Sequence, residues 1–458
     1  MIIPVEKNKT YPLIIEDVSS DGNGIGHIDG FTVFVAGTVT GDEIECLIVK
    51  VRSHFAYGKA VKIVTPSPYR VVPGCMAYKR CGGCQLMHIS YEYQKVIKKN
   101  IVDNALSRIG GFEGFETEDV IGMDIPKRYR NKMIFPVGKN KDGKTICGFY
   151  ARRSHDIMEV GDCLLGAEIN QSINDTVLEY MAENNVVAYD EESHSGIVRR
   201  VFTRVAHTTG DVMVVLSVNA DEVPNAKALI AKLTALDKSI KSIILNINKK
   251  RTNLVLGEKN ITLYGEDTIF DTLLGIRFEI SPHSFYQVNP VMTEKLYQKA
   301  IEYANLSGNE NVMDIYCGIG TISLCVAKDA KKVIGVEIVE AAIENAKENA
   351  KNNGITNAHF YADSAENIVP KLIDEGERPD VVIIDPPRKG SDEKTLSAIV
   401  KASPKRVVYV SCNPSTLARD ARFLCENGYK LDKAMCYDLF PNTVHVETVA
   451  KFCIEGMN

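Results

Sequence analysis

The sequence has 458 residues, too many for one hydrophobic core, so we expect about two to four domains. Hydrophobic residues make up 45% of the chain and charged residues 25%, proportions that are ordinary for a globular protein. The net charge of −5 gives no global sign of nucleic-acid binding. No stretch approaches the roughly 20 apolar residues of a membrane-spanning helix, and no signal-peptide pattern is present. We therefore expect a cytoplasmic protein that does not bind membranes.

Residues 1–66 alternate apolar and polar positions over short segments, as half-buried strands do. The expected strands are 11–18, 31–35, 42–50 and 58–64, with glycine-rich turns such as 21–24 between them. The pattern predicts a small antiparallel β-barrel. The segment Pro66-Ser67-Pro68 then predicts a linker, because proline ends strands and stiffens the chain.

Two further regions follow the barrel. Residues 67–275 predict a mixed α/β central domain, with a cysteine-rich loop, a helix near 91–109, and strands such as 211–218 and 242–247. Residues 276–458 alternate strands with amphipathic helices. The apolar strands are 311–316, 332–336, 381–384 and 407–411. Repeated strand–helix units predict an α/β fold with a doubly wound, mostly parallel sheet.

A turn that contains two glycines, Gly318 and Gly320, follows strand 311–316. Glycine lets the backbone turn tightly and approach a ligand at the carboxyl edge of a parallel sheet. The next strand ends in Glu337, about 20 residues on, whose carboxylate can accept hydrogen bonds from both ribose hydroxyls. Because the three-glycine dinucleotide fingerprint is absent, an adenosyl ligand without pyrophosphate fits better than NAD.

Three more polar residues belong to the same C-terminal region. The two prolines after Asp385 hold the chain extended, so its carboxylate is presented to the same crevice. Cys412 follows another strand and can act as a nucleophile if its thiolate is stabilised, although a buried strand cysteine without a role is the competing interpretation. Glu447 lies in an apolar strand, where a raised pKa would suit a general base. Methylation of uracil at carbon 5 requires this set, because a thiolate must activate the ring and a base must remove a proton.

Three of the twelve cysteines, Cys75, Cys81 and Cys84, lie close together in the central region. Cytosolic thiols stay reduced, so this clustering indicates metal ligation rather than disulfides. Cys163 or Cys147 could supply a fourth ligand. Four thiolates can hold zinc or an iron–sulfur cluster, and the spacing does not decide between them.

Six ordered motifs together resemble those of the RNA uracil-C5 methyltransferase family, and above all its enzymes for bacterial 23S ribosomal RNA. The motifs are Cys81-Gly82-Gly83-Cys84, Ser284-Phe285-Tyr286-Gln287-Val288-Asn289, Asp314-Ile315-Tyr316-Cys317-Gly318, Asp385-Pro386-Pro387-Arg388, Ser411-Cys412-Asn413-Pro414 and His445-Val446-Glu447. The resemblance covers nearly the whole chain. It implies a class I methyltransferase domain, an N-terminal TRAM domain of the oligonucleotide-binding type, and an RNA substrate.

The resemblance also implies a role for individual residues. The expected contacts to S-adenosylmethionine are Gln287, Tyr316, Glu337 and Asp385. The expected ligands of a 4Fe–4S cluster are Cys75, Cys81, Cys84 and Cys163. Cys412 is the expected nucleophile and Glu447 the expected base. The role of Gln287 rests on the resemblance alone.

Other functions compete with this interpretation. A radical S-adenosylmethionine enzyme would combine cluster and cofactor, but it needs a tighter cysteine triad on a barrel. A non-catalytic RNA-binding protein would leave Cys412 and Glu447 unexplained. The third alternative is a tRNA uridine methyltransferase. We favour ribosomal RNA over tRNA as the substrate because the resembling tRNA enzymes lack both the barrel and the cysteine cluster. We expect a monomer, with the basic run Lys127–Lys132 holding RNA phosphates.

Overall fold

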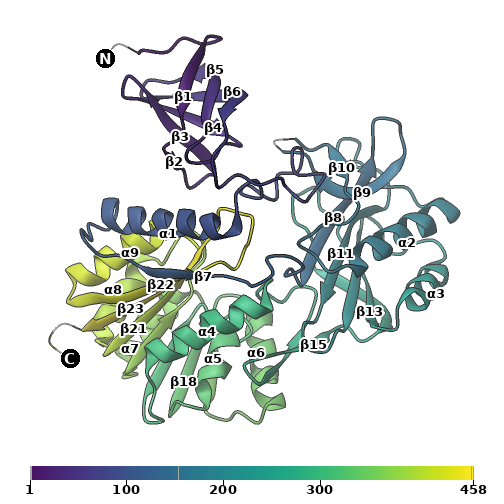
Figure 1. Ribbon diagram of the computed structural model, residues 1–458. Coiled ribbons are helices and arrows are strands. Elements are labelled where there is room, and N and C mark those ends of the chain that lie inside the picture. The colour runs from purple at the N-terminus through teal and green to yellow at the C-terminus, as the bar shows by residue number, and fades with distance from the viewer. Residues whose placement is uncertain (1–2, 153, 455, 457–458) are drawn as a thin grey trace. The chain divides into compact units, whose positions relative to one another are not determined.

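The computed structural model describes residues 3–152, 154–454 and 456 of the chain. The chain divides into two compact units, and Figure 1 traces it by colour from the N-terminus to the C-terminus. Unit 1 comprises Met1–Pro126, Cys412–Arg422 and Lys433–Thr448. Unit 2 comprises Lys127–Ser411, Phe423–Asp432 and Val449–Asn458. Within the described ranges, no helix combines the length and apolarity that crossing a membrane requires.

Unit 1 begins with a six-stranded sheet in the order β1-β5-β6-β4-β3-β2. Its strands are β1 (Thr10–Ile14), β2 (Asp17–Val18), β3 (Asn23–Ile28), β4 (Phe31–Ala36), β5 (Glu43–Val51) and β6 (Phe55–Thr65). Alternate residues such as Val33, Val35 and Ile48 are fully buried and form its core, as the alternating pattern predicts. The expectation of a purely antiparallel barrel is wrong at one pair, because β4 and β6 run parallel.

The glycine-rich turn expected at 21–24 is present at residues 20–22, and strand β3 begins at Asn23, within the expected turn. The two glycines of β3 allow close approach to the neighbouring chain. A Cβ atom on Gly24 would lie 2.1 Å from the Thr38 hydroxyl oxygen, and one on Gly26 would lie 2.3 Å from the Ile14 carbonyl oxygen. Glycine in a strand therefore marks crowding here rather than the end of the strand.

Unit 1 continues with α1 (Tyr91–Arg108), the helix that the sequence predicted, and with β7 (Glu118–Ile121). Ile97, Val102 and Leu106 give α1 a buried apolar side. Lys98 is also fully buried on this helix, which is unusual because lysine side chains are almost never fully buried unless they are paired.

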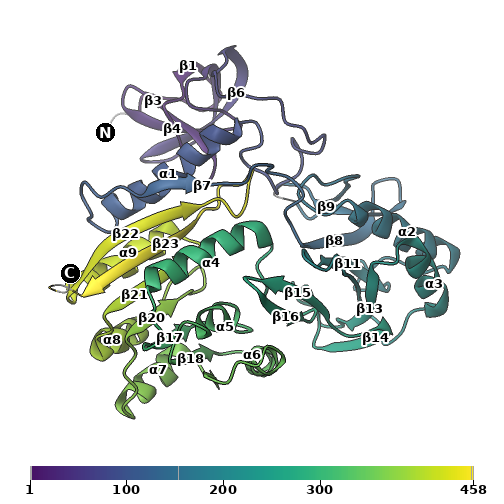
Figure 2. The ribbon, with the colours of Figure 1, turned by 60° about the horizontal axis from the view of Figure 1, so that its bottom comes forward.

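Unit 2 contains a seven-stranded sheet in the order β10-β9-β8-β11-β12-β13-β14. Its strands are β8 (Lys132–Lys139), β9 (Thr145–Tyr150), β10 (Ile157–Glu159), β11 (Val198–Val205), β12 (Val212–Val218), β13 (Ile240–Ile247) and β14 (Lys259–Gly265). The helices α2 (Ile169–Glu183) and α3 (Ala226–Leu236) pack against it and share one hydrophobic core with it (Figures 1 and 2). A separate hairpin, β15 (Ile269–Leu273) and β16 (Ile276–Ile280), follows.

The C-terminal sheet has eight strands in the order β19-β18-β17-β20-β21-β23-β22-β7. Besides β7, its strands are β17 (Asn311–Ile315), β18 (Lys332–Glu337), β19 (Ala358–Ala362), β20 (Val381–Ile384), β21 (Arg406–Ser411), β22 (Tyr429–Tyr437) and β23 (Glu447–Ile454). Helices alternate with them: α4 (Pro290–Ala304), α5 (Thr321–Ala327), α6 (Glu340–Asn352), α7 (Ala365–Asp374), α8 (Glu393–Ala402) and α9 (Pro414–Glu426). Strands β17 to β21 are parallel, as predicted, and the strand order reverses between β17 and β20. Ligands bind at the carboxyl ends of strands at such a reversal.

Candidate functional site

Polar side chains gather in unit 2 at the carboxyl ends of four neighbouring strands. These residues are Tyr316 after β17, Glu337 at the end of β18, Asp363 after β19 and Asp385 after β20. Because the carboxyl ends of parallel strands meet at one edge of the sheet, the fold brings the four together. Three of them were predicted from the sequence, and Asp363 was not.

The turn after β17 is held tightly against β18. The main-chain N–H groups of Tyr316 and Cys317 both donate to the Val336 carbonyl, at 2.8 and 2.9 Å. Tyr316 adopts a φ of 70°, which is costly for a residue with a side chain and is typical of functional sites. The Gly318 N–H donates to Glu337 Oε2 at 3.3 Å, so the glycine turn and the carboxylate are fixed relative to each other.

Two carboxyl groups of this edge have raised pKa values. Burial raises the pKa of Asp314, within β17, to about 6, although its Oδ2 accepts a hydrogen bond from the Ser323 hydroxyl at 2.5 Å. Burial also raises the pKa of Asp385 to about 7, and the charge of Asp314 adds to the effect. A low-dielectric site with an excess of carboxyl groups favours ligands that are cationic or rich in hydrogen-bond donors.

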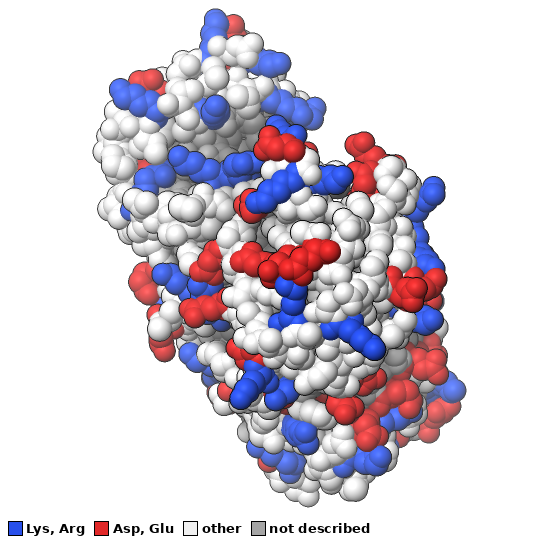
Figure 3. Space-filling view, turned by 90° about the vertical axis from the view of Figure 1, so that its right-hand side faces the viewer, with Lys and Arg blue, Asp and Glu red and all other residues white. Residues whose placement is uncertain are grey.

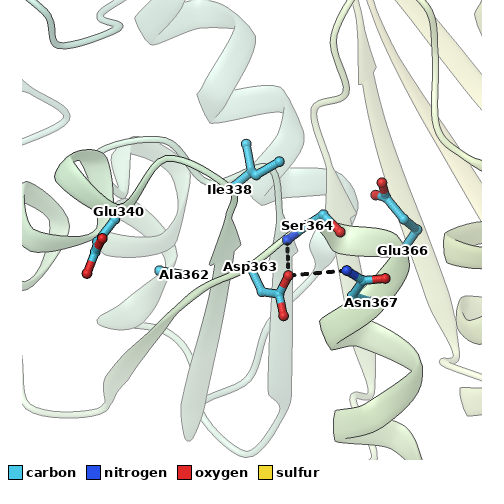
Figure 4. Close-up of a pocket in the computed structure, with 7 residues that line it drawn as sticks. All are labelled: Ile338, Glu340, Ala362, Asp363, Ser364, Glu366 and Asn367. Carbon is cyan, nitrogen blue, oxygen red and sulfur yellow. Dashed lines mark hydrogen bonds between the residues drawn. The ribbon is translucent and has the colours of Figure 1, made fainter. Parts of the chain in front are cut away.

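A pocket of about 620 Å³ is lined by Ile338, the residue after Glu337 (Figure 4). Its lining includes Ile338, Asp363 and Asn367. Asp363 Oδ1 accepts hydrogen bonds from the Ser364 N–H at 2.7 Å and from Asn367 Nδ2 at 3.4 Å, which orients the carboxylate. The volume suits a ligand the size of a nucleoside. A signal for Asp363 existed in the sequence, because it follows a strand just as Asp385 does.

Gln287 lies in a segment that is anchored at both sides. Its carbonyl accepts a hydrogen bond from Asn131 Nδ2 at 2.9 Å, and the next carbonyl, of Val288, accepts from the Asn131 N–H at 2.8 Å. Asn289 then caps α4 through its side chain, which accepts from the Met292 N–H at 3.2 Å. These contacts fix the backbone that carries Gln287.

Cys412 and Glu447 belong to neighbouring strands of the C-terminal sheet. Cys412 is partly buried directly after β21, and Glu447 is buried at the start of β23. The Ile454 N–H, at the end of β23, donates to the Lys405 carbonyl just before β21 begins, so the two strands run in opposite directions. Glu447 lies as many residues before Ile454 as Cys412 lies after Lys405. The end of β21 therefore lies beside the start of β23, which places Cys412 and Glu447 at the same end of this strand pair.

The four cysteines expected to bind a cluster are partly buried. Cys75, Cys81 and Cys84 belong to unit 1 and Cys163 to unit 2. The Gly83 N–H donates to Cys81 Sγ at 3.4 Å. The donor set suits iron or zinc chemically, but in the described part of the chain no three metal-binding side chains gather closely enough to hold an ion. Cys147, the alternative fourth ligand, is buried in the core against α2 and α3, and burial raises its pKa.

Sequence comparison finds two families along the chain. A sequence model described as tRNA (Uracil-5-)-methyltransferase matches residues 211–452, and one of the TRAM domain matches residues 4–61. The chain is 48% identical to an uncharacterized RNA methyltransferase of Clostridium tetani, with 98% of this chain and 97% of the relative covered. It is 45% identical to an uncharacterized RNA methyltransferase of Bacillus cereus, with 98% of each covered.

Structure comparison agrees with these matches. The fold is similar to the crystal structure of Pyrococcus abyssi tRNA (uracil-54, C5)-methyltransferase in complex with S-adenosyl-L-homocysteine. The TM-score is 0.78 and the identity 28%, with 96% of this chain and 99% of that chain covered. The likeness confirms the expected fold class, an α/β doubly wound sheet preceded by a TRAM barrel and a mixed α/β region.

Proposed function

The chain belongs to the tRNA (uracil-5-)-methyltransferase family, and we propose that it methylates carbon 5 of a uridine with S-adenosylmethionine as methyl donor, in 23S ribosomal RNA as the resemblance of its motifs implies. The observation that carries the proposal is the gathering of Tyr316, Glu337 and Asp385 at one edge of the parallel sheet. The same sheet carries Cys412 after β21 and Glu447 at the start of β23.

The residues at the sheet edge fit an adenosyl cofactor. Glu337 is held in place to accept hydrogen bonds from ribose hydroxyls, and the pocket beside it, with Asp363, has room for the adenine base. Tyr316, Asp385 and Gln287 complete the proposed binding set. When bound, S-adenosylmethionine supplies an electrophilic methyl group on a positively charged sulfur, which suits the acidic character of this edge.

Cys412 and Glu447 are the proposed catalytic pair. The Cys412 thiolate forms a bond to carbon 6 of the uracil, and the electron pair of the ring double bond moves to make carbon 5 nucleophilic. Carbon 5 would then bond to the methyl carbon of the donor while the methyl–sulfur bond breaks, its electron pair staying on the sulfur of the departing thioether. Glu447 then removes the carbon 5 proton, the double bond reforms, and the thiolate leaves. The target base has to leave its stack to reach these groups.

Covalent trapping tests this chemistry. RNA that contains 5-fluorouridine lacks the proton that Glu447 would remove, so we expect a stable adduct with the wild-type protein and S-adenosylmethionine. Cys412→Ser should give no adduct, and Glu447→Gln should accumulate a methylated adduct on ordinary RNA. Wild-type protein that binds RNA without forming an adduct would instead indicate a non-catalytic RNA-binding protein.

Transfer RNA is the second candidate substrate, and the likeness to the Pyrococcus enzyme favours it. The argument that the barrel separates ribosomal RNA enzymes from tRNA enzymes is wrong, because that tRNA enzyme aligns with 96% of this chain. Mapping 5-methyluridine in both RNAs of a deletion strain distinguishes the two. Loss from 23S ribosomal RNA supports the proposal, and loss from tRNA alone overturns it.

We also propose a 4Fe–4S cluster on Cys75, Cys81, Cys84 and Cys163. The support is the thiol chemistry and partial burial of all four residues and the N–H donated to Cys81 Sγ, since hydrogen bonds to sulfur stabilise thiolate ligands. Protein purified without oxygen should contain iron and acid-labile sulfide, and Cys81→Ser should lose both. Zinc in place of iron would contradict the proposal.

A further inference from the structure

Two basic residues face each other directly on paired strands of unit 2. Arg204 on β11 and Lys132 on β8 are register partners in an antiparallel pair, so their side chains lie on the same face of the sheet. Arg204 is fully buried. Its Nη2 donates to the Ser284 carbonyl at 2.9 Å, whereas its Nε and Nη1 have no hydrogen-bond partner in the described structure.

Two more unpartnered donors belong to the same cluster. Arg130 Nε and the buried Tyr286 hydroxyl also lack hydrogen-bond partners among the residues described. Burial, together with the charges of Arg204 and Arg130, lowers the pKa of Lys132 to about 8, so the three cations lie close enough to repel one another. Tyr286 lies close enough to Arg204 for the two groups to interact electrostatically.

No carboxylate within the described residues forms an ion pair with these three cations. Asp271 acts on Arg204 through its charge, but its oxygens already accept hydrogen bonds from the N–H groups of His207 and Thr208, at 2.9 and 2.8 Å. A buried cation without an ion pair, such as Arg204, is unfavourable, and like charges directly opposite each other on paired strands add to the cost. The arrangement therefore calls for an anion from outside the chain.

Other basic residues of unit 2 show the contrast. Several pair with carboxylates of the chain itself: Arg128 with Asp162, Arg199 with Glu191, Lys249 with Asp221, and Lys250 with Glu258. On the face shown in Figure 3, basic and acidic side chains are interspersed rather than separated. The run Lys127–Lys132 is thus not one uniform RNA-binding surface, because Arg128 is already neutralised.

We propose that Arg204, Lys132 and Arg130, together with the Tyr286 hydroxyl, bind a phosphodiester group of the substrate RNA. This inference rests on the proposed function and adds where the RNA backbone is held. Asn131 and Arg204 both hydrogen-bond to the segment that leads to Gln287, so a phosphate bound there is tied to the cofactor-binding segment. Phosphate contacts set the position of a nucleic acid without reading its sequence.

The salt dependence of RNA affinity in the full-length protein tests the site. Lys132→Gln and Arg130→Gln should each reduce the slope of log affinity against log salt by about 0.7 to 0.9, the value for one lost phosphate contact. Lys250→Gln is the matched control, because its ion pair with Glu258 predicts an unchanged slope. Arg204→Met should weaken RNA binding at least about tenfold without lowering the melting temperature, since it removes an unpaired buried charge.

Each outcome decides between defined alternatives. Unchanged slopes for Lys132→Gln and Arg130→Gln overturn the inference. Weaker S-adenosylmethionine binding with an unchanged slope would assign the cations to the cofactor carboxylate and overturn it as well. If the wild-type protein methylates uridine while the slopes stay constant, the inference alone fails. If the slopes fall but no uridine is methylated, the phosphate site stands and the proposed function fails.

Discussion

Asp385 combines burial with a neighbouring carboxyl group, and its titration should be visible in the stability of the protein. Its pKa is about 7 in the folded chain and about 4 in an unfolded one. The protonated form therefore contributes stability that is fully present below pH 4 and is lost as the pH rises through 7. Asp385→Asn should remove this loss. The difference in free energy of unfolding between the variant and wild type should therefore shift in favour of the variant by roughly 2 kcal/mol from pH 5 to pH 8.

Urea unfolding of both proteins at the two pH values measures this difference. Asp124→Asn, at an exposed carboxylate, serves as the control and should change neither value. Parallel stability curves for wild type and Asp385→Asn would contradict the assignment. The same variant should bind S-adenosylmethionine more weakly, because the amide cannot supply the negative charge that we propose contacts the cofactor.

Lys98 and Asp438 form a fully buried ion pair in unit 1, with 2.5 Å between Nζ and Oδ1. Burial lowers the pKa of Lys98, while Asp438 and Glu447 oppose that effect. Lys98→Met would leave the Asp438 carboxylate buried and unpaired, so we expect a loss of about 3 to 5 kcal/mol in the free energy of unfolding. The double variant Lys98→Met, Asp438→Leu should recover much of it. Equal stability of the single variant and wild type, measured by denaturant unfolding, would refute the role of the pair.

At the scale of elements, the close packing of β18 against β19 depends on Gly335. A Cβ atom there would lie 2.5 Å from the Phe360 ring and 2.9 Å from Cys317 Sγ, next to the cofactor turn. Gly335→Ala should therefore cost about 1 to 3 kcal/mol and weaken cofactor binding. Adding Phe360→Leu makes room for the new methyl group and should restore part of the stability and part of the cofactor affinity. Calorimetry with and without S-adenosylmethionine measures the two effects, and an Ala variant with unaltered cofactor affinity would show that the turn tolerates the strain.

At the scale of the whole molecule, the N-terminal barrel offers an aromatic surface for RNA. Phe34, Phe55 and Tyr57 form a ring cluster with centroids 5.4 to 6.0 Å apart, and Tyr57 is 39% exposed. Bases stack on such rings with about 1 to 3 kcal/mol each. Tyr57→Ala should raise the KM for RNA about tenfold and leave S-adenosylmethionine binding unchanged. Tyr264→Ala, at an exposed tyrosine of β14, is the control, and an equal effect of both variants would argue against a specific role of the barrel.

The sequence by itself determined the local part of this architecture. The strands that precede Tyr316, Glu337, Asp385 and Cys412 followed from apolar runs, and helix α1 from its own pattern, because periodicity reports on neighbours along the chain. Parallel strands share a carboxyl edge, so the order of these motifs was enough to predict that the candidate cofactor residues meet. The role of Gln287 came from family resemblance alone. The roles of the site residues and the cluster ligands stay predictions.

Only the tertiary structure decided which distant segments pair. Lys98 and Asp438 are 340 residues apart, and nothing local marks either as a partner of the other. The sequence placed Lys132 in a basic run expected to hold RNA phosphates, but nothing in it linked Lys132 to Arg204. The pairing of β8 with β11 sets the two face to face, and Arg204 is buried. The parallel pairing of β4 with β6 was missed for the same reason. Strand pairing and burial depend on the packing of the whole chain, and hydrophobic periodicity carries no information about which strands become neighbours.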